Sequence, residues 1–90
     1  MKTFPLRISS PEGDVFCGDA QVLSLRGTEG ELAIMAGHVP FVTAVVACDC
    51  SVTLADGCVR TAHTEGGLLT VGAHRVVLLS GSFGFADETK

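Results

Sequence analysis

The chain has 90 residues, a length that forms one domain around one modest hydrophobic core. Its net charge is −4 and its six Lys and Arg residues are scattered, so there is no basic stripe to neutralise nucleic-acid phosphates. Hydrophobic residues make up 47% of the chain, but the longest mostly apolar stretch, 33–48, is interrupted by glycine, histidine, proline and threonine. It falls short of the ~20 apolar residues that a membrane-spanning helix needs, which predicts no direct membrane insertion.

The first residues contain no apolar segment of the kind that defines a secretory signal peptide, which predicts a cytoplasmic location. The cysteines are therefore expected to be reduced and to act as small hydrophobic residues; they are Cys17, Cys48, Cys50 and Cys58. The large hydrophobic fraction has two interpretations that the composition leaves open. It can fill a core, or it can form surface that a partner covers.

Eleven glycines and three prolines divide the chain into short pieces rich in Val, Thr, Ile, Leu and Phe. Short β-favouring runs between turn residues predict an all-β sandwich or barrel. In chain order, the expected strands are 3–8, 15–17, 21–26, 32–35, 41–47, 51–55, 58–61, 68–71 and 75–79.

Two local features of these strands can be predicted in more detail. Gly18 and Asp19 indicate a bulge or bend before the strand 21–26. Further along, the Asp56-Gly57 dipeptide is a strong signal for a two-residue hairpin turn. A turn of that length pairs Leu54 with Val59, Val52 with Thr61, and Cys50 with His63.

The second half of the chain contains one ambiguous segment. Residues 41–56 lack Gly and Pro and could hold a helix, but six β-branched residues favour strand. The last two predicted strands, 68–71 and 75–79, are nearly continuous apolar runs, which predicts that both of their faces are covered. Residues 1–86 are expected to form the domain, and residues 87–90 a polar tail.

Candidate sites for chemistry are few. Cys48 and Cys50, with His63 across the predicted hairpin, are three candidate zinc ligands, but structural sites use wider cysteine spacings and a fourth ligand, so ordinary packing is favoured. No nucleophile elbow and no phosphate-binding loop occurs. Nothing apolar flanks both Glu29 and Glu31 to raise a pKa, which favours a solvated, partner-facing role. These residues predict a chain that is not an enzyme and needs no cofactor or metal.

Several ordered segments carry more information than any single residue. Residues 27–34 read GTEGELAI, and residues 37–40 read GHVP. Supporting segments are PEGDVFCG at 11–18, ADG at 55–57, EGGLLTV at 65–71 and VVLL at 76–79. In this order the segments resemble the epsilon subunit of rotary ATP synthases, which is called delta in mitochondria. The resemblance covers nearly the whole chain.

The resemblance implies a two-sheet β-sandwich of short, mostly antiparallel strands. It further implies a non-catalytic central-stalk subunit of a proton-translocating F-type ATP synthase. Such a subunit couples rotation of the membrane c-ring to the gamma subunit and the catalytic head. Its implied partners are the gamma subunit and the polar loops of the c-ring. Its implied location is peripheral, at the cytoplasmic face of the bacterial inner membrane.

Site residues follow from the resemblance position by position. The positions that match the family's ring-facing contact are Glu29, Glu31 and Met35. The positions that match its gamma-facing contact are Ser10, His38 and Thr43. The two acids suit basic groups on ring loops, and the methionine can supply apolar contact beside them.

Two departures from the family pattern stand out. Residues 80–83 read SGSF, where the family usually has Ala-Asp-Thr-Ala or a similar run. In addition, the resemblance is to the N-terminal β-sandwich domain without the C-terminal helical hairpin that usually follows it. That hairpin is the family's regulatory element, and in some members it inhibits ATP hydrolysis. The alternative that the residues leave open is a stand-alone β-sandwich that serves as a protein-interaction module.

Overall fold

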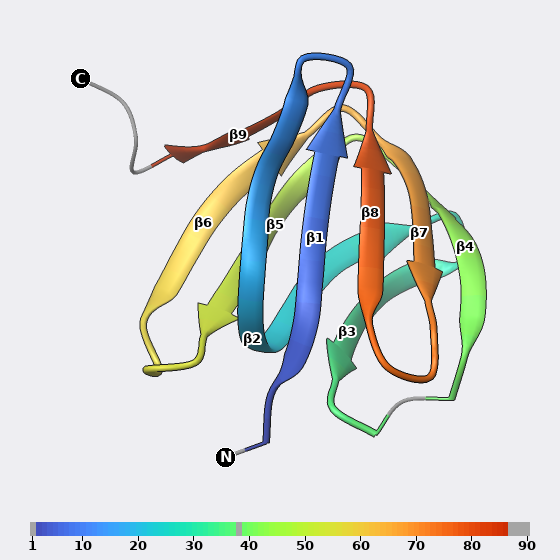
Figure 1. Cartoon of the computed structure of the whole chain (residues 1–90). Coiled ribbons are helices and arrows are strands. Elements are labelled where there is room, and N and C mark those ends of the chain that lie inside the picture. Colours follow the sequence, from blue (N-terminus) through green and yellow to red (C-terminus); the bar gives the residue numbers. More distant parts are fainter. Residues whose placement is uncertain (1, 38, 87–90) are drawn as a thin grey trace.

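The computed structural model describes residues 2–37 and 39–86. All the secondary-structure elements in this part of the chain are β-strands, arranged as shown in Figure 1. Their bounds are β1 Phe4–Ser10, β2 Gly13–Gly27, β3 Gly30–Met35, β4 Phe41–Val45, β5 Cys48–Leu54, β6 Val59–Thr64, β7 Gly67–Val71, β8 Val76–Ser80 and β9 Phe83–Phe85. The all-β prediction is confirmed.

The strands form the two layers of a β-sandwich, and the 15-residue strand β2 belongs to both. Its first half pairs with β1, and β8, β7 and β4 follow in that order to complete the first sheet. Its second half pairs with β3 and β5, and β6 and β9 complete the second sheet. Figure 1 shows β2 (blue to cyan) running beside β1 and then turning behind it. Pairing is antiparallel throughout the described strands except between β1 and β8.

The core lies between the two sheets and follows from period-two patterning. On β1, Phe4, Leu6 and Ile8 point inward while Pro5 and Arg7 are exposed. Full burial of a large apolar side chain contributes roughly 1.5–3 kcal/mol, so each of these positions stabilises the sandwich. The remaining buried hydrophobic residues are Ala20, Leu23, Leu25, Ile34, Val45, Cys50, Val52, Ala62, Leu69, Val71, Val76, Leu78 and Phe85.

The bulge predicted at Gly18 and Asp19 is not there. Both residues pair in register with β1. The irregularities of β2 lie elsewhere, opposite β1 between Ile8 and Ser9 and opposite β5 between Ala20 and Val22. Packing does not require the glycine either, because a Cβ at position 18 would be in ordinary van der Waals contact with the Phe16 ring, at 3.4 Å. The two strands predicted at 15–17 and 21–26 are therefore one continuous strand.

The predicted hairpin exists, but its register is shifted by one residue. The amide of Gly57 donates to the carbonyl of Leu54 at 2.9 Å, and the amide of Leu54 donates to the carbonyl of Cys58 at 2.8 Å. This is a three-residue loop with the glycine at φ 91°. Asp56 does not take the positive φ that a two-residue type I′ turn needs, and its carboxylate instead accepts the amide of Cys58. The observed pairs are Thr53 with Val59, Val52 with Arg60, Ser51 with Thr61, Cys50 with Ala62, and Asp49 with His63.

The remaining strand predictions are partly confirmed. Segment 41–56 forms β4 and β5 rather than a helix, as predicted, although β4 ends at Val45. The expectation that both faces of β7 and β8 are covered is wrong, because Leu68 and Leu79 are exposed. Strand β9 was not predicted; it is three residues long and includes Gly84, which gives it little sequence signal. Residues 87–90 lie outside the described part of the chain.

Candidate interaction surfaces

The β2–β3 hairpin carries the first candidate surface, because the acidic tip of the ordered sequence motif lies on it. Gly27 and Gly30 pair at the end of the two strands, and Gly30 has a φ of 123° that favours glycine. The turn is fastened to β4, since the Thr28 amide donates to the Ala44 carbonyl at 3.2 Å. Glu29 projects from a turn with a defined position on the sandwich.

The second acid of this hairpin has a basic neighbour. Glu31 pairs with Arg26 across the hairpin at 2.9 Å, while 77% of the Glu31 side chain stays exposed to solvent. Met35 lies on the same outward face of β3, four steps of ~3.3 Å along the strand from Glu31, or roughly 13 Å. The acids Glu29 and Glu31 thus lie together at the tip, while Met35 lies at the far end of the strand.

The residues expected to contact gamma are not gathered in one place. Ser10 ends β1, where its hydroxyl donates to Glu12 at 3.1 Å and to the Gly13 carbonyl at 3.3 Å. Thr43 lies on β4, two strands further from β1 than β8, and its half-buried side chain alternates with the exposed Val42. His38 lies outside the described residues.

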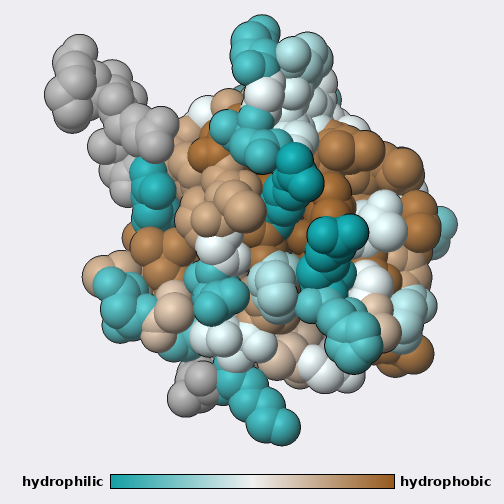
Figure 2. Space-filling model, viewed as in Figure 1, coloured by the Kyte–Doolittle hydropathy of each residue, from teal (hydrophilic) through white to brown (hydrophobic). Residues whose placement is uncertain are grey.

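A second surface was not predicted from the sequence as a site. Leu68 on β7 pairs with Leu79 on β8 on one side and with Ala44 on β4 on the other. Val42 lies on β4 two residues before Ala44, so its side chain is on the same side of the sheet. The exposed fractions of the side chains are 43% for Leu68, 50% for Leu79 and 61% for Val42. We call these four residues the apolar face. Figure 2 shows brown atoms gathered on the right of the molecule, over β7 and β8.

A polar group borders the apolar face on the β1 side. Arg7 forms a two-point ion pair with Asp14, with contacts of 3.1 and 3.2 Å, and the Ser9 hydroxyl donates to the same carboxylate at 2.7 Å. The hydrogen bonds from Ser9 and Arg7 lower the pKa of Asp14, and the bond to Asp14 raises the pKa of Arg7. An apolar surface rimmed by charged groups is typical of a site that another molecule covers.

The outer face of the second sheet holds a shallow groove of about 960 Å³. Its lining mixes small polar residues, among them Ser24, Ser51 and Thr61, with apolar residues such as Leu32 and Ala33. Charged groups lie along one side, where Asp49 and His63 pair across β5 and β6 with a contact of 2.9 Å between the carboxylate and Nδ1. The described residues therefore present an apolar outer face on the first sheet and a mixed outer face, with charged groups along one side, on the second.

The candidate zinc ligands are separated by the register of the hairpin. Cys50 points into the core, and its burial raises the pKa of its thiol to about 12, whereas His63 points outward. The Cys48 thiol lies 3.4 Å from the Arg26 amide. Among the residues that the structure describes, no three His, Cys, Asp or Glu side chains converge on a point where a metal ion could bind.

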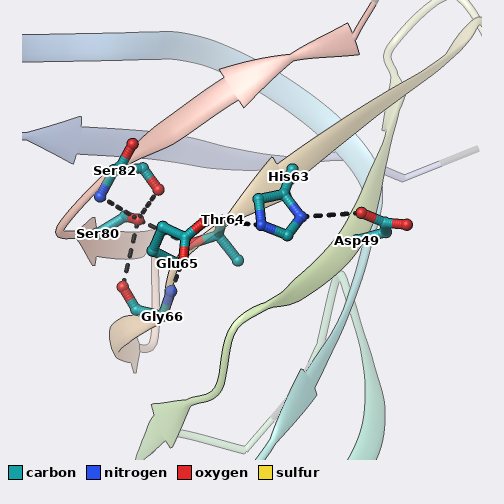
Figure 3. A network of polar contacts seen from close by, with 7 residues as sticks. All are labelled: Asp49, His63, Thr64, Glu65, Gly66, Ser80 and Ser82. Carbon is teal, nitrogen blue, oxygen red and sulfur yellow. Dashed lines mark hydrogen bonds and ion pairs between the residues drawn. The ribbon is translucent and has the colours of Figure 1, made fainter.

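A buried polar junction lies where the two sheets meet, at a place that sequence reasoning did not single out. The hydroxyls of Thr64 on β6 and Ser80 on β8 are 2.6 Å apart, and the Gly66 amide donates to the Thr64 hydroxyl at 3.0 Å. Ser80 also bonds the carbonyl of Ser82 at 2.7 Å, so the β6–β7 and β8–β9 turns are tied together (Figure 3). The one signal in the sequence is the SGSF run, which departs from the family pattern.

Comparison with known proteins identifies related molecules. The chain matches the family model described as "ATP synthase, Delta/Epsilon chain, beta-sandwich domain" over residues 3–85. It is 32% identical over 87 residues to the "ATP synthase epsilon chain, sodium ion specific" of Acetobacterium woodii, and the match covers 97% of this chain and 65% of that relative.

Two solved structures show the same fold. A chain of the Euglena gracilis mitochondrial ATP synthase superposes with a TM-score of 0.88 at 18% identity, over 98% of this chain and 56% of that one. A chain of the Tetrahymena thermophila mitochondrial ATP synthase, in a structure of its central stalk and c-ring, superposes with a TM-score of 0.76 at 10% identity, over 92% of this chain and 66% of that one. The chain thus spans less than two thirds of the length of each of these three proteins.

Proposed function

Because the chain belongs to the family of β-sandwich domains from ATP synthase delta and epsilon chains, we propose that it is the epsilon subunit of a rotary ATP synthase. In this role it couples rotation of the c-ring to the gamma subunit and the catalytic head, and it catalyses no reaction itself. The observation that carries the proposal is the family match over residues 3–85, which spans all nine of the described strands.

We assign the apolar face to the contact with the gamma subunit. Leu68, Leu79 and Val42 are large hydrophobic side chains on neighbouring strands of one sheet, and each leaves two fifths or more of its surface in water. Covering them removes apolar surface from water at roughly 25 cal/mol per Å², and the Arg7–Asp14 pair provides a polar rim. Apolar centre and charged rim are the usual anatomy of a protein interface.

The three positions that the sequence resemblance assigned to gamma remain part of this proposal. Ser10 lies at the β1 end of the same sheet, and Thr43 lies on β4 beside Val42 and Ala44 of the apolar face. Since the side chain of Thr43 alternates with the outward pair and is half-buried, only its exposed part is available for that contact. His38 precedes β4 in sequence and lies outside the described residues.

We assign the β2–β3 hairpin tip to the polar loops of the c-ring. Glu29 and Glu31 give the tip two acids, and the Arg26 partner of Glu31 is itself exposed, so a basic group on a ring loop can share the Glu31 carboxylate. Exposed pairs of this kind are weak on their own, and they contribute register and association rate more than affinity. Met35 contributes apolar contact only if the ring surface reaches along the whole of β3.

The location and the coupling ion form a separate part of the proposal. We place the chain peripherally at the cytoplasmic face of a bacterial inner membrane; in the described residues no helix is long and apolar enough to span a bilayer. For the ion we propose protons. The relative from Acetobacterium woodii is named as sodium ion specific, so dependence of ATP synthesis on added sodium is the measurement that decides between the ions.

The test of the proposed role is reconstitution. The purified chain is added to an ATP synthase complex of the same organism from which the epsilon subunit has been removed. We expect stoichiometric rebinding and recovery of ion-driven ATP synthesis. If the chain does not bind to the depleted complex, it is instead a stand-alone β-sandwich that binds another protein.

A further inference from the structure

His63 occupies a position between two carboxylates that come from different elements. Its Nδ1 lies 2.9 Å from a carboxylate oxygen of Asp49 on β5, and its Nε2 lies 2.9 Å from a carboxylate oxygen of Glu65. Glu65 follows the end of β6 and begins the turn into β7. Figure 3 shows the imidazole between the two acids, with one ring nitrogen directed at each.

The same turn is held from the inner side of the sheet by the polar junction. Thr64, the next residue after His63, points inward and accepts the Gly66 amide at 3.0 Å. The Glu65 amide donates to the Ser82 carbonyl at 3.0 Å, and the Gly81 amide donates to the Gly66 carbonyl at 3.1 Å. The turn is thus held by hydrogen bonds on the inner side of the sheet and by the His63 contacts on the outer side. Of these groups, only the His63 imidazole gains or loses a proton near neutral pH.

We propose that His63 is a proton-operated latch that closes the β6–β7 turn when its ring is protonated and loosens that turn when its ring is neutral. An imidazolium ring has two N–H groups and can donate to Asp49 and Glu65 at once. A neutral ring has one N–H and one lone pair, so it can donate to one carboxylate while the other carboxylate faces a lone pair. Loss of the proton therefore replaces one of the two hydrogen bonds by a repulsive contact.

The charged groups around His63 favour the closed form. Asp49 faces it from β5, Glu65 faces it from its own turn, and β9, which pairs beside it at Gly84, has no titratable side chain. Arg26 and Glu31 line the same groove and are paired with each other. The hydrogen bond to Asp49 and then the one to Glu65 raise the pKa of His63.

The sign of the effect follows from that direction. A raised pKa in the folded chain means that the latch stabilises the turn fully below the ordinary histidine pKa of about 6.5. This stabilisation is lost as the pH rises through the pKa that His63 has in the folded chain. Because the three side chains are exposed, the latch is screened by salt and weakens at high ionic strength.

The latch lies at one end of the apolar face. The turn runs directly into Leu68 through Gly67, and Ser80 of the polar junction directly follows Leu79. Opening the turn therefore loosens the backbone that presents both leucines. A pH effect on partner docking rests on the proposed function, whereas the latch itself is a property of the isolated chain.

The experiment is residue-resolved amide hydrogen exchange on the isolated full chain, from about pH 5.5 to about pH 8.5, the range in which histidine titrates. The readout is the protection factor of the Glu65, Gly66 and Gly81 amides, which corrects for the intrinsic pH dependence of exchange. We expect protection of these amides to fall several-fold as the pH rises through the His63 titration, observed in the same samples by NMR. The His63→Gln variant should show low protection with no pH dependence.

Two controls keep the result specific. His74→Gln removes the exposed histidine of the β7–β8 turn and should leave the wild-type pH profile unchanged. Asp49→Asn should lower the NMR midpoint of His63, which provides a readout that does not need His63→Gln to fold. Protection that is independent of pH in the wild-type chain, or a His63 midpoint unaffected by Asp49→Asn, would overturn the latch without bearing on the proposed synthase role.

Discussion

Leu68 and Leu79 lie directly opposite each other on β7 and β8, and both point away from the core into solvent. An antiparallel pair of leucines gains little from mutual contact while each keeps about half of its surface in water. Their neighbours in the same sheet, Val42 and Ala44, extend the exposed apolar surface onto β4. Covering this surface would remove apolar side chains from water, and this is the basis for the proposed contact with the gamma subunit.

Ser80→Ala should destabilise the fold by roughly 1–3 kcal/mol. The Ser80 hydroxyl lies 2.6 Å from the Thr64 hydroxyl and also bonds the carbonyls of Gly66 and Ser82, so its removal deletes one hydrogen bond to each of these three groups. Urea unfolding followed by circular dichroism measures the change. Thr70→Val, on an exposed position of β7, is the matched control and should stay within about 0.5 kcal/mol. An equal loss in both variants would contradict the assigned role of the junction.

Gly67→Ala should be far more damaging than alanine at other strand glycines. A Cβ at position 67 would lie 1.9 Å from the carbonyl oxygen of Leu79, so β7 and β8 could not pair at their present distance. We expect a loss of roughly 3 kcal/mol or more, or failure to fold. Gly84→Ala on β9 places its Cβ in open space and serves as the control. Comparable stability of the two variants would show that β7 and β8 are further apart than described.

Thiol reactivity provides a test of the core assignment. Cys50 is buried, and burial raises its thiol pKa to about 12, so the reactive thiolate is scarce at neutral pH. Cys17 and Cys58 are exposed and should react first with a thiol reagent in the folded chain. Peptide mapping after brief labelling identifies the modified positions, and Cys50 should be labelled only after unfolding. Rapid labelling of Cys50 in native buffer would place it outside the core.

Glu31→Lys tests the proposed ring contact. The change removes the partner of Arg26 and places a second positive charge beside it, so binding to basic ring loops should weaken about tenfold, equivalent to about 1.4 kcal/mol. Asp19→Lys makes the same charge change at an exposed position of β2 that pairs with Pro5, away from the tip of the β2–β3 hairpin, and should have little effect. The measurement is the affinity of the purified c-ring with gamma for each variant. Equal affinities for both variants would count against the ring assignment.

Period-two patterning and turn residues were enough to predict most of the strands. Phe4, Leu6 and Ile8 alternate with polar or exposed residues, and they form the buried face of β1 as expected. The register of the β5–β6 hairpin could not be predicted, because Asp56-Gly57 fits both a two-residue turn and a three-residue loop. The length of the loop decides whether His63 pairs with Cys50 or with Asp49. It therefore decides whether the histidine lies beside a thiol or beside a carboxylate.

Some of the candidate surfaces could be predicted from local sequence motifs, whereas others become visible only in the folded chain. The acids Glu29 and Glu31 were found from a local motif, and both lie on the exposed hairpin tip. The Thr64–Ser80 contact joins residues 16 positions apart, on strands of different sheets, and no local pattern in the chain predicts it. For β7 and β8, a continuous apolar run was compatible with cover from within the chain or from a partner, and only the packed sandwich distinguishes the two.

Binding of the chain to the gamma subunit of the same organism, followed by calorimetry, bears directly on the proposed role in the central stalk. We expect a one-to-one complex that Leu79→Gln weakens by more than about 1 kcal/mol, because the change puts a polar group into the apolar face. Val59→Gln alters a side chain with a similar exposed fraction, 60%, on the second sheet and should bind like the unaltered chain. No complex at micromolar concentration, or equal weakening by both variants, would contradict the assignment of the apolar face to gamma.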